Sequence, residues 1–328
     1  MKRDIPIAQV MPGDILLYRS KGLISDAIRF IDRSEVSHAG LFLGRHDGMG
    51  RTVGEATREG VIRRTLPKSV EHAEGVESRR LKEPPESLDP ALERAEYYLK
   101  RGERYAFEPI LLLAFLCITR NLSASSILGG LIRETLDAAA AFLLHLFNTG
   151  REPVICSEFV FRCYDEALPG LIDVLVRSPG VLRFGEREIP IGKKRGIHHG
   201  SALSLLLEKH GGELSEGHVD LAGALRTAGT VDVAAVEQLI EIYFNDLQKQ
   251  APKTARIDLM VPELQPSFER FAAILYLARR RPEKEELRRA AVLGDLFDVA
   301  ADFVTPGDLQ RSKSLAFIGK LDMKGSGT

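Results

Sequence analysis

Tryptophan is absent from this chain of 328 residues, and aromatic residues make up only 7% of it. Proteins that stack bases depend on aromatic side chains, so this composition does not favour such a platform. Lysine and arginine total 45 against 46 for aspartate and glutamate, which gives a net charge of −1. Nucleic-acid-binding domains usually carry a basic excess, and we therefore expect no nucleic-acid partner.

Cysteine is also scarce, with only Cys117, Cys156 and Cys163 in the chain. An odd number of cysteines without metal-ligand spacing favours neither a disulfide framework nor a zinc site. The neighbouring His198 and His199 have no third ligand at metal spacing, and catalytic zinc normally needs three protein ligands. We expect no metal and no cofactor.

Long uncharged apolar runs are missing as well. Residues 109–118 and 127–147 are apolar, but the second run is interrupted by charges, and neither reaches the roughly 20 residues of a membrane span. We expect buried helices there, with a lid or a surface that rests on lipid as the alternative. The first ten residues contain no apolar signal-peptide core, which predicts a cytoplasmic protein unless export follows a route without an N-terminal mark.

The chain does contain enough apolar residues, 44%, for a substantial core. Turn residues and short apolar runs predict strands at 15–18, 38–43, 51–56, 60–63 and 315–318, and a short helix at 23–31. Apolar spacing predicts a helix at 156–167. Most of 171–300 has a polar, helical pattern.

Two segments of the chain carry the residue types of nucleophilic catalysis. The first is Ser37-His38-Ala39-Gly40-Leu41, and the second is Ile155-Cys156-Ser157-Glu158-Phe159. The predicted helix starts near Cys156, and both a helix N-terminus and a nearby imidazolium stabilise a thiolate. His38 starts a predicted strand, a rigid position from which an imidazole can act as base.

Glu55, near the end of the next predicted strand, could orient that imidazole as the third member of a triad. A structural histidine and a surface glutamate are the alternatives for these two residues. Glu158 is more simply explained as a favourable charge at the helix N-terminus. Cys163 is expected to be a small core residue.

These motifs, together with Pro12-Gly13-Asp14 and Gly54-Glu55-Ala56, resemble the circularly permuted NlpC/P60 papain-like hydrolases. The similarity is to the YiiX/YaeF-like group, with the lecithin:retinol acyltransferase-like proteins as a more distant branch. The resemblance implies an α+β fold in which an antiparallel sheet packs on helices, with the His-bearing strand before the Cys-bearing helix. It further implies Cys156 as nucleophile, His38 as base and Glu55 as the third polar residue.

The resemblance also implies a domain plan. Residues 1–170 would form the papain-like catalytic domain, with an apolar helical insertion at about 106–150. Residues 171–300 would be a second, mostly helical insertion, and 301–328 would return to the catalytic domain and end in a tail.

Three functions remain open at this point. The first is a cysteine amidase or peptidase that forms a thioester acyl-enzyme. The second is a lipid acyl hydrolase or acyltransferase that uses the same thiol, with peripheral lipid contact. The third is a non-catalytic interaction module.

Overall fold

The computed structural model describes residues 4–102, 105–106, 109–120, 126–174, 180–184, 187–191, 197, 201–206, 217–249, 261–280, 288–301 and 303–322. The chain divides into two compact units. The first unit consists of residues 1–108, 154–175 and 304–328, and the second of residues 109–153 and 176–303. The two stretches expected to be separate insertions, about 106–150 and 171–300, therefore lie largely in the second unit. That the first unit is a catalytic domain stays a prediction.

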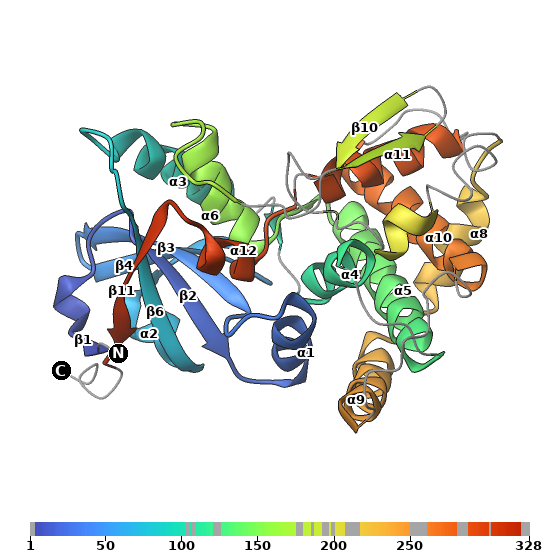
Figure 1. Cartoon of the computed structure of the whole chain (residues 1–328), viewed down its shortest axis with the longest axis horizontal. Helices are drawn as coiled ribbons and strands as arrows, with labels where there is room; N and C mark the ends of the chain where they lie inside the picture. Colours follow the sequence, from blue (N-terminus) through green and yellow to red (C-terminus); the bar gives the residue numbers. More distant parts are fainter. Residues whose placement is uncertain are drawn as a thin grey trace. The chain divides into compact units, whose positions relative to one another are not determined.

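The first unit is built on a seven-stranded sheet (Figure 1) with the order β1-β11-β6-β2-β3-β4-β5. Its strands are β1 (Asp4–Ile5), β2 (Ile15–Ser20), β3 (His38–His46), β4 (Gly50–Thr57), β5 (Gly60–Thr65), β6 (Ala73–Leu81) and β11 (Leu315–Leu321). Neighbouring strands are antiparallel except at the edge, where β1 pairs with β11 in parallel. The mixed α+β class is confirmed, and the expectation of a wholly antiparallel sheet is wrong at this edge.

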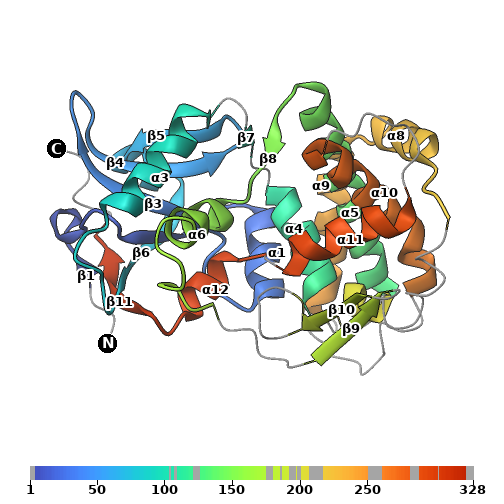
Figure 2. The same cartoon turned by 90° about the horizontal axis from the view of Figure 1, so that it is seen from above.

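Both faces of the sheet are covered, as alternation along β4 shows. Val53 belongs to a buried core with Leu66 and Val70 of α2 (Leu66–Val70). At the next residue, Gly54, an added Cβ would lie 3.2 Å from Phe159 of α6 (Cys156–Asp165). Side chains alternate between faces along a strand, so α2 covers one face and α6 the other. Figure 2 shows α6 next to α3 (Asp89–Lys100).

The turn before β2 is held by a buried carboxylate. Asp14 is 1% exposed and accepts hydrogen bonds from Arg80 at 2.6 and 2.8 Å and from the backbone N–H of Met11 at 2.9 Å. Gly13 has a φ of 87°, a conformation that glycine adopts without strain. The Pro12-Gly13-Asp14 motif therefore has a structural role in this chain, because it fixes the start of β2.

The C-terminal segment is anchored to α1 (Leu23–Asp32) by another buried carboxylate. Asp32 accepts from Thr305 Oγ1 at 2.7 Å, from the Gly307 N–H at 3.0 Å and from Arg311 at 3.1 Å. Thr305 and Asp308 form a reciprocal cap at the start of α12 (Pro306–Arg311), which satisfies backbone donors that the first turn leaves unpaired. This arrangement leads the chain into β11 and back into the sheet.

The second unit is mainly helical, with α4 (Pro109–Thr119), α5 (Ser126–Asn148), α8 (Leu221–Gly229), α9 (Val233–Lys249), α10 (Val261–Arg280) and α11 (Arg289–Ala301). Helix α5 packs against α4, α8, α9 and α10. The strands β9 (Gly180–Phe184) and β10 (Arg187–Ile191) form an antiparallel hairpin, so the expectation that 171–300 is mostly helical is incomplete. Among the residues that the structure describes, no helix combines the length and apolar character needed to cross a bilayer.

Candidate active site

Helix α6 begins at Cys156, as the sequence predicts. The residue before it, Ile155, is extended, and among the described residues no side chain caps this N-terminus. The first backbone N–H groups of a helix have no intrahelical acceptor, and in α6 these groups belong to the turn that contains Cys156. Glu158 lies in the same turn and pairs with Arg162 at 2.5 Å. The thiol itself is buried.

His38 is the first residue of β3 and pairs with Tyr18 of β2. The rings of these two residues lie 5.2 Å apart at 54°. His38 Nε2 lies 3.7 Å from Glu55 Oε1, and the imidazole side chain keeps 19% of its surface exposed. Cys156 is buried and His38 is partly exposed. Of these two side chains, only the imidazole of His38 therefore reaches solvent.

Glu55 comes from β4, where it pairs with Gly40, two residues after His38. This register places Glu55 diagonally across from His38 on the same face of the sheet. The Glu55 side chain is only 3% exposed, and Ser69 of α2 donates a hydrogen bond to its Oε1 at 2.8 Å. The hydroxyl groups of Ser69 and Tyr18 lie 2.6 Å apart.

The electrostatics of His38 depend on both of its partners. Burial, the largest single influence, lowers the pKa of His38, but charge attraction and a hydrogen bond with Cys156, together with the same two interactions with Glu55, raise it to about 10. For Glu55, burial raises the pKa, but the hydrogen bond and charge of His38 and the hydroxyls of Ser69 and Tyr18 hold it below its usual value. The arrangement therefore favours a charged imidazole between two acceptors.

The structure thus brings together the three residues singled out from the sequence, Cys156, His38 and Glu55. It adds Tyr18 and Ser69, which the sequence analysis missed. Tyr18 could have been noticed, because it ends the apolar run of β2 with a polar atom. No local pattern marks Ser69, because its place depends on the packing of α2 on β4.

The remaining cysteines, Cys117 of α4 and Cys163 of α6, are also buried. Burial raises the pKa of the Cys117 thiol to about 12 and that of the Cys163 thiol well above its usual value. Ser157, next to Cys156, donates its hydroxyl to the carbonyl of Val304 at 2.7 Å. A serine nucleophile would have to give up this hydrogen bond.

No metal cluster accompanies the site in the part of the chain that the structure describes. There, no group of three or more His, Cys, Asp or Glu side chains could hold a metal ion. His198 and His199 lie outside the described residues.

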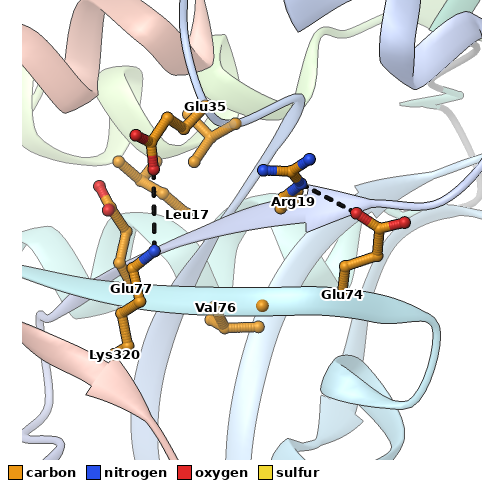
Figure 3. Close-up of a pocket in the computed structure, with 9 residues that line it drawn as sticks. Leu17, Arg19, Glu35, Glu74, Val76, Glu77 and Lys320 are labelled. Carbon is orange, nitrogen blue, oxygen red and sulfur yellow. Dashed lines mark hydrogen bonds and ion pairs between the residues drawn. The ribbon is translucent and has the colours of Figure 1, made fainter. Parts of the chain in front are cut away.

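A pocket of about 280 Å³ also lies on the first unit, over Leu17, Val36 and Val76 (Figure 3). Each charged side chain around it has a partner of opposite sign. Arg19 pairs with Glu74 at 2.8 Å, Lys320 with Glu35 at 3.7 Å and Glu77 with Arg79 at 2.9 Å. A charged ligand would have to break one of these ion pairs. We therefore assign no ligand or function to this pocket.

Comparison with known proteins agrees with the predicted resemblance. No family model matches the chain. It is similar to a curated protein, "Probable lipoprotein peptidase YaeF" of Escherichia coli (strain K12), with 36% identity over 72 residues. The match spans 22% of this chain and about a quarter, 24%, of YaeF. A solved structure described as the metalloprotein yiiX from Escherichia coli O157:H7 has 20% identity and a TM-score of 0.31, over 54% of this chain and 74% of that one. The short match to YaeF is consistent with the predicted resemblance to the YiiX/YaeF-like group.

Proposed function

We propose that this protein is a cysteine hydrolase that cleaves an amide or peptide bond through a thioester acyl-enzyme. The observation that carries the proposal is the position of His38, whose imidazole interacts with both Cys156 and Glu55. A nucleophile, a base in contact with it and a third group that orients the base are the recurring parts of this chemistry.

The proposed reaction follows from these positions. In the resting site His38 already holds the proton that it shares with the Cys156 thiol, and the sulfur attacks the carbonyl carbon of the substrate as a thiolate. The backbone N–H groups of the first turn of α6 stabilise the oxyanion. The C–N bond then breaks as His38 gives its proton to the leaving amine, which leaves an acyl group on the sulfur. Water, deprotonated by His38, hydrolyses the thioester, releases a carboxylic acid and restores the thiol.

Chain order supports a permuted papain-like arrangement within the proposal. The strand that carries His38 precedes the helix that begins at Cys156, and the resemblance implies this same order. The limited likeness to a protein named as a probable lipoprotein peptidase favours a peptide as substrate. The function of YaeF enters here only as part of the proposal, because the match covers 24% of that protein.

The lipid alternative has less support from the structure. It depended on the apolar stretches 109–118 and 127–147 as an acyl groove or a membrane-resting surface. In α4 the side chains from Ile110 to Thr119 are all buried, so this helix presents no apolar surface to a lipid. We therefore place amide cleavage first.

Acyl transfer to Cys156 is the direct test. The full chain is incubated with p-nitrophenyl acetate, with a peptide mixture and, separately, with phosphatidylcholine vesicles, and intact mass spectrometry then detects an acyl adduct. The proposal predicts an adduct from the ester and from peptides, and none in Cys156→Ala. The matched control is Cys163→Ala, which removes a thiol from the same helix and should retain the adduct.

Three results would count against the proposal. An acyl adduct of equal yield in Cys156→Ala would show that Cys156 is not the nucleophile. Acylation from vesicles alone would favour the lipid acyl enzyme. Absence of any adduct under all three conditions would favour the non-catalytic module.

A further inference from the structure

The buried carboxylate of Glu55 needs partners of its own. Its side chain is 3% exposed, and a carboxylate removed from water is unstable unless hydrogen bonds replace its hydration. His38 supplies only part of this need, because its Nε2 lies 3.7 Å from Glu55 Oε1, whereas a carboxylate has two oxygens that each accept more than one hydrogen bond. A second source of donors must therefore hold the carboxylate.

The hydroxyl groups of Ser69 and Tyr18 supply these donors. A serine hydroxyl has one proton, and that of Ser69 goes to Glu55 Oε1 at 2.8 Å. The Tyr18 hydroxyl lies 2.6 Å from that of Ser69 and also interacts with Glu55, so Tyr18 can offer its own proton to either of them. Burial, followed by the charge of Glu55, raises the pKa of Tyr18 well above its usual value, so the phenol keeps this proton.

Tyr18 also contacts the base directly. Its ring packs against the His38 ring at 5.2 Å, while its hydroxyl interacts with Glu55 and with Ser69. Gly40, between them, leaves room for this arrangement, since an added Cβ would lie 3.2 Å from the Tyr18 hydroxyl and 3.1 Å from Glu55 Cγ. One side chain thus fixes both the imidazole and the carboxylate.

We infer that Tyr18 and Ser69 are positioning residues that hold the Glu55 carboxylate against His38 and the His38 ring toward Cys156. The inference rests on the proposed function and extends the three-residue site to five. The groups acting on Glu55 are His38 from β3, Tyr18 from β2 and Ser69 from α2, and Arg64 of β5 acts on Tyr18.

The test uses Ser69→Ala, Tyr18→Phe and their combination, with Ser69→Thr as the conservative variant that keeps the hydroxyl. Alkylation of Cys156 by iodoacetamide is followed across pH by peptide mass spectrometry, and p-nitrophenyl acetate hydrolysis gives kcat and KM. Loss of a hydrogen bond to a charged group predicts a fall of about tenfold in kcat and in the alkylation rate, with KM little changed. In these variants the acidic limb of the pH–rate profile should move to higher pH, because Glu55 without its hydroxyl donor accepts a proton more readily. Ser69→Thr should restore the wild-type profile.

A second readout needs no turnover. NMR titration of the His38 ring should show protonation at lower pH in Ser69→Ala than in the wild-type chain, because the carboxylate is held less firmly. Unchanged pH profiles and an unchanged His38 titration in both single variants would overturn the inference. If Cys156→Ala is inactive while these variants behave as wild type, only the inference fails. If Cys156→Ala hydrolyses the ester normally, the proposed function fails, and the His38 titration still decides the positioning role.

Discussion

His38 Nε2 lies 3.7 Å from Glu55 Oε1, although the two residues come from different strands and the carboxylate is almost fully enclosed. The contact follows from the register of β3 and β4, in which Gly40 faces Glu55. It gives the imidazole a fixed carboxylate partner in addition to Cys156. The proposed chemistry depends on this contact and on the one between His38 and the thiol.

Glu55→Gln tests how much the negative charge contributes. The amide can still accept the hydrogen bond of Ser69, but it no longer attracts a charged imidazole. We expect hydrolysis of p-nitrophenyl acetate to fall about tenfold, whereas His38→Ala removes the base and should cost about 10²–10⁴-fold. Steady-state kcat/KM of both variants checks this order. Equal losses in the two variants would assign Glu55 a larger role than orientation.

Stability should depend on pH through His38. Its pKa is raised from 6.5 to about 10, so the folded state binds this proton more tightly than the unfolded state does. The resulting stabilisation is fully present below pH 6.5 and is lost as the pH rises through about 10. The Tm difference between the wild-type chain and His38→Gln should therefore be largest below pH 6.5 and shrink toward pH 10.

His46→Gln, at the exposed end of the same strand, is the control for this measurement. A difference between the wild-type chain and His38→Gln that stays constant over the whole range would contradict the assigned electrostatics. Glu55 acts in the opposite direction. Its lowered pKa adds stability above its unfolded value of 4.5, and this stability is lost as the pH falls through the folded value.

Gly40→Ala should damage both the fold and the site. The added Cβ would lie 2.9 Å from Val53 Cγ1 and 3.1 Å from Glu55 Cγ, and overpacking of this kind costs about 1–3 kcal/mol. We expect a lower Tm and slower alkylation of Cys156. Gly75→Ala on β6 is the matched control, since its added Cβ meets nothing within 4 Å. Equal behaviour of the two variants would show that the space at Gly40 is unimportant.

Local patterns were sufficient to predict the elements that carry the three site residues. Apolar alternation and turn residues predict β2, β3 and β4, and the start of α6 at Cys156 follows from helical spacing. The return of 315–318 to a strand is also confirmed, as β11. These features depend on residues close together in the chain.

Features that depend on distant residues were missed. The sequence analysis did not predict β6, because the run Glu77-Ser78-Arg79-Arg80 looks solvent-exposed. In the fold, Glu77 and Ser78 are buried, and Asp14 neutralises Arg80. The sequence analysis also predicted no helix at 305–309, although Thr305 and Asp308 have the spacing of a helix cap.

The positioning chain of Tyr18 and Ser69 could not have been predicted for a related reason. It requires β2 next to β3 in the sheet and α2 packed on β4, and neither arrangement is encoded in a short motif. Sheet order is set by the whole chain, so the residues that support a site are harder to predict than those that form it.

Alkylation of the three cysteines is the measurement that tests the central claim most directly. The native chain and His38→Ala are treated with iodoacetamide near neutral pH, and peptide mass spectrometry follows each thiol over time. The account predicts that Cys156 reacts well before Cys117 and Cys163, whose pKa values are raised by burial, and that this lead disappears in His38→Ala. A Cys156 that reacts no faster than the other two, or at the same rate with and without the imidazole, would contradict the pairing of thiol and base.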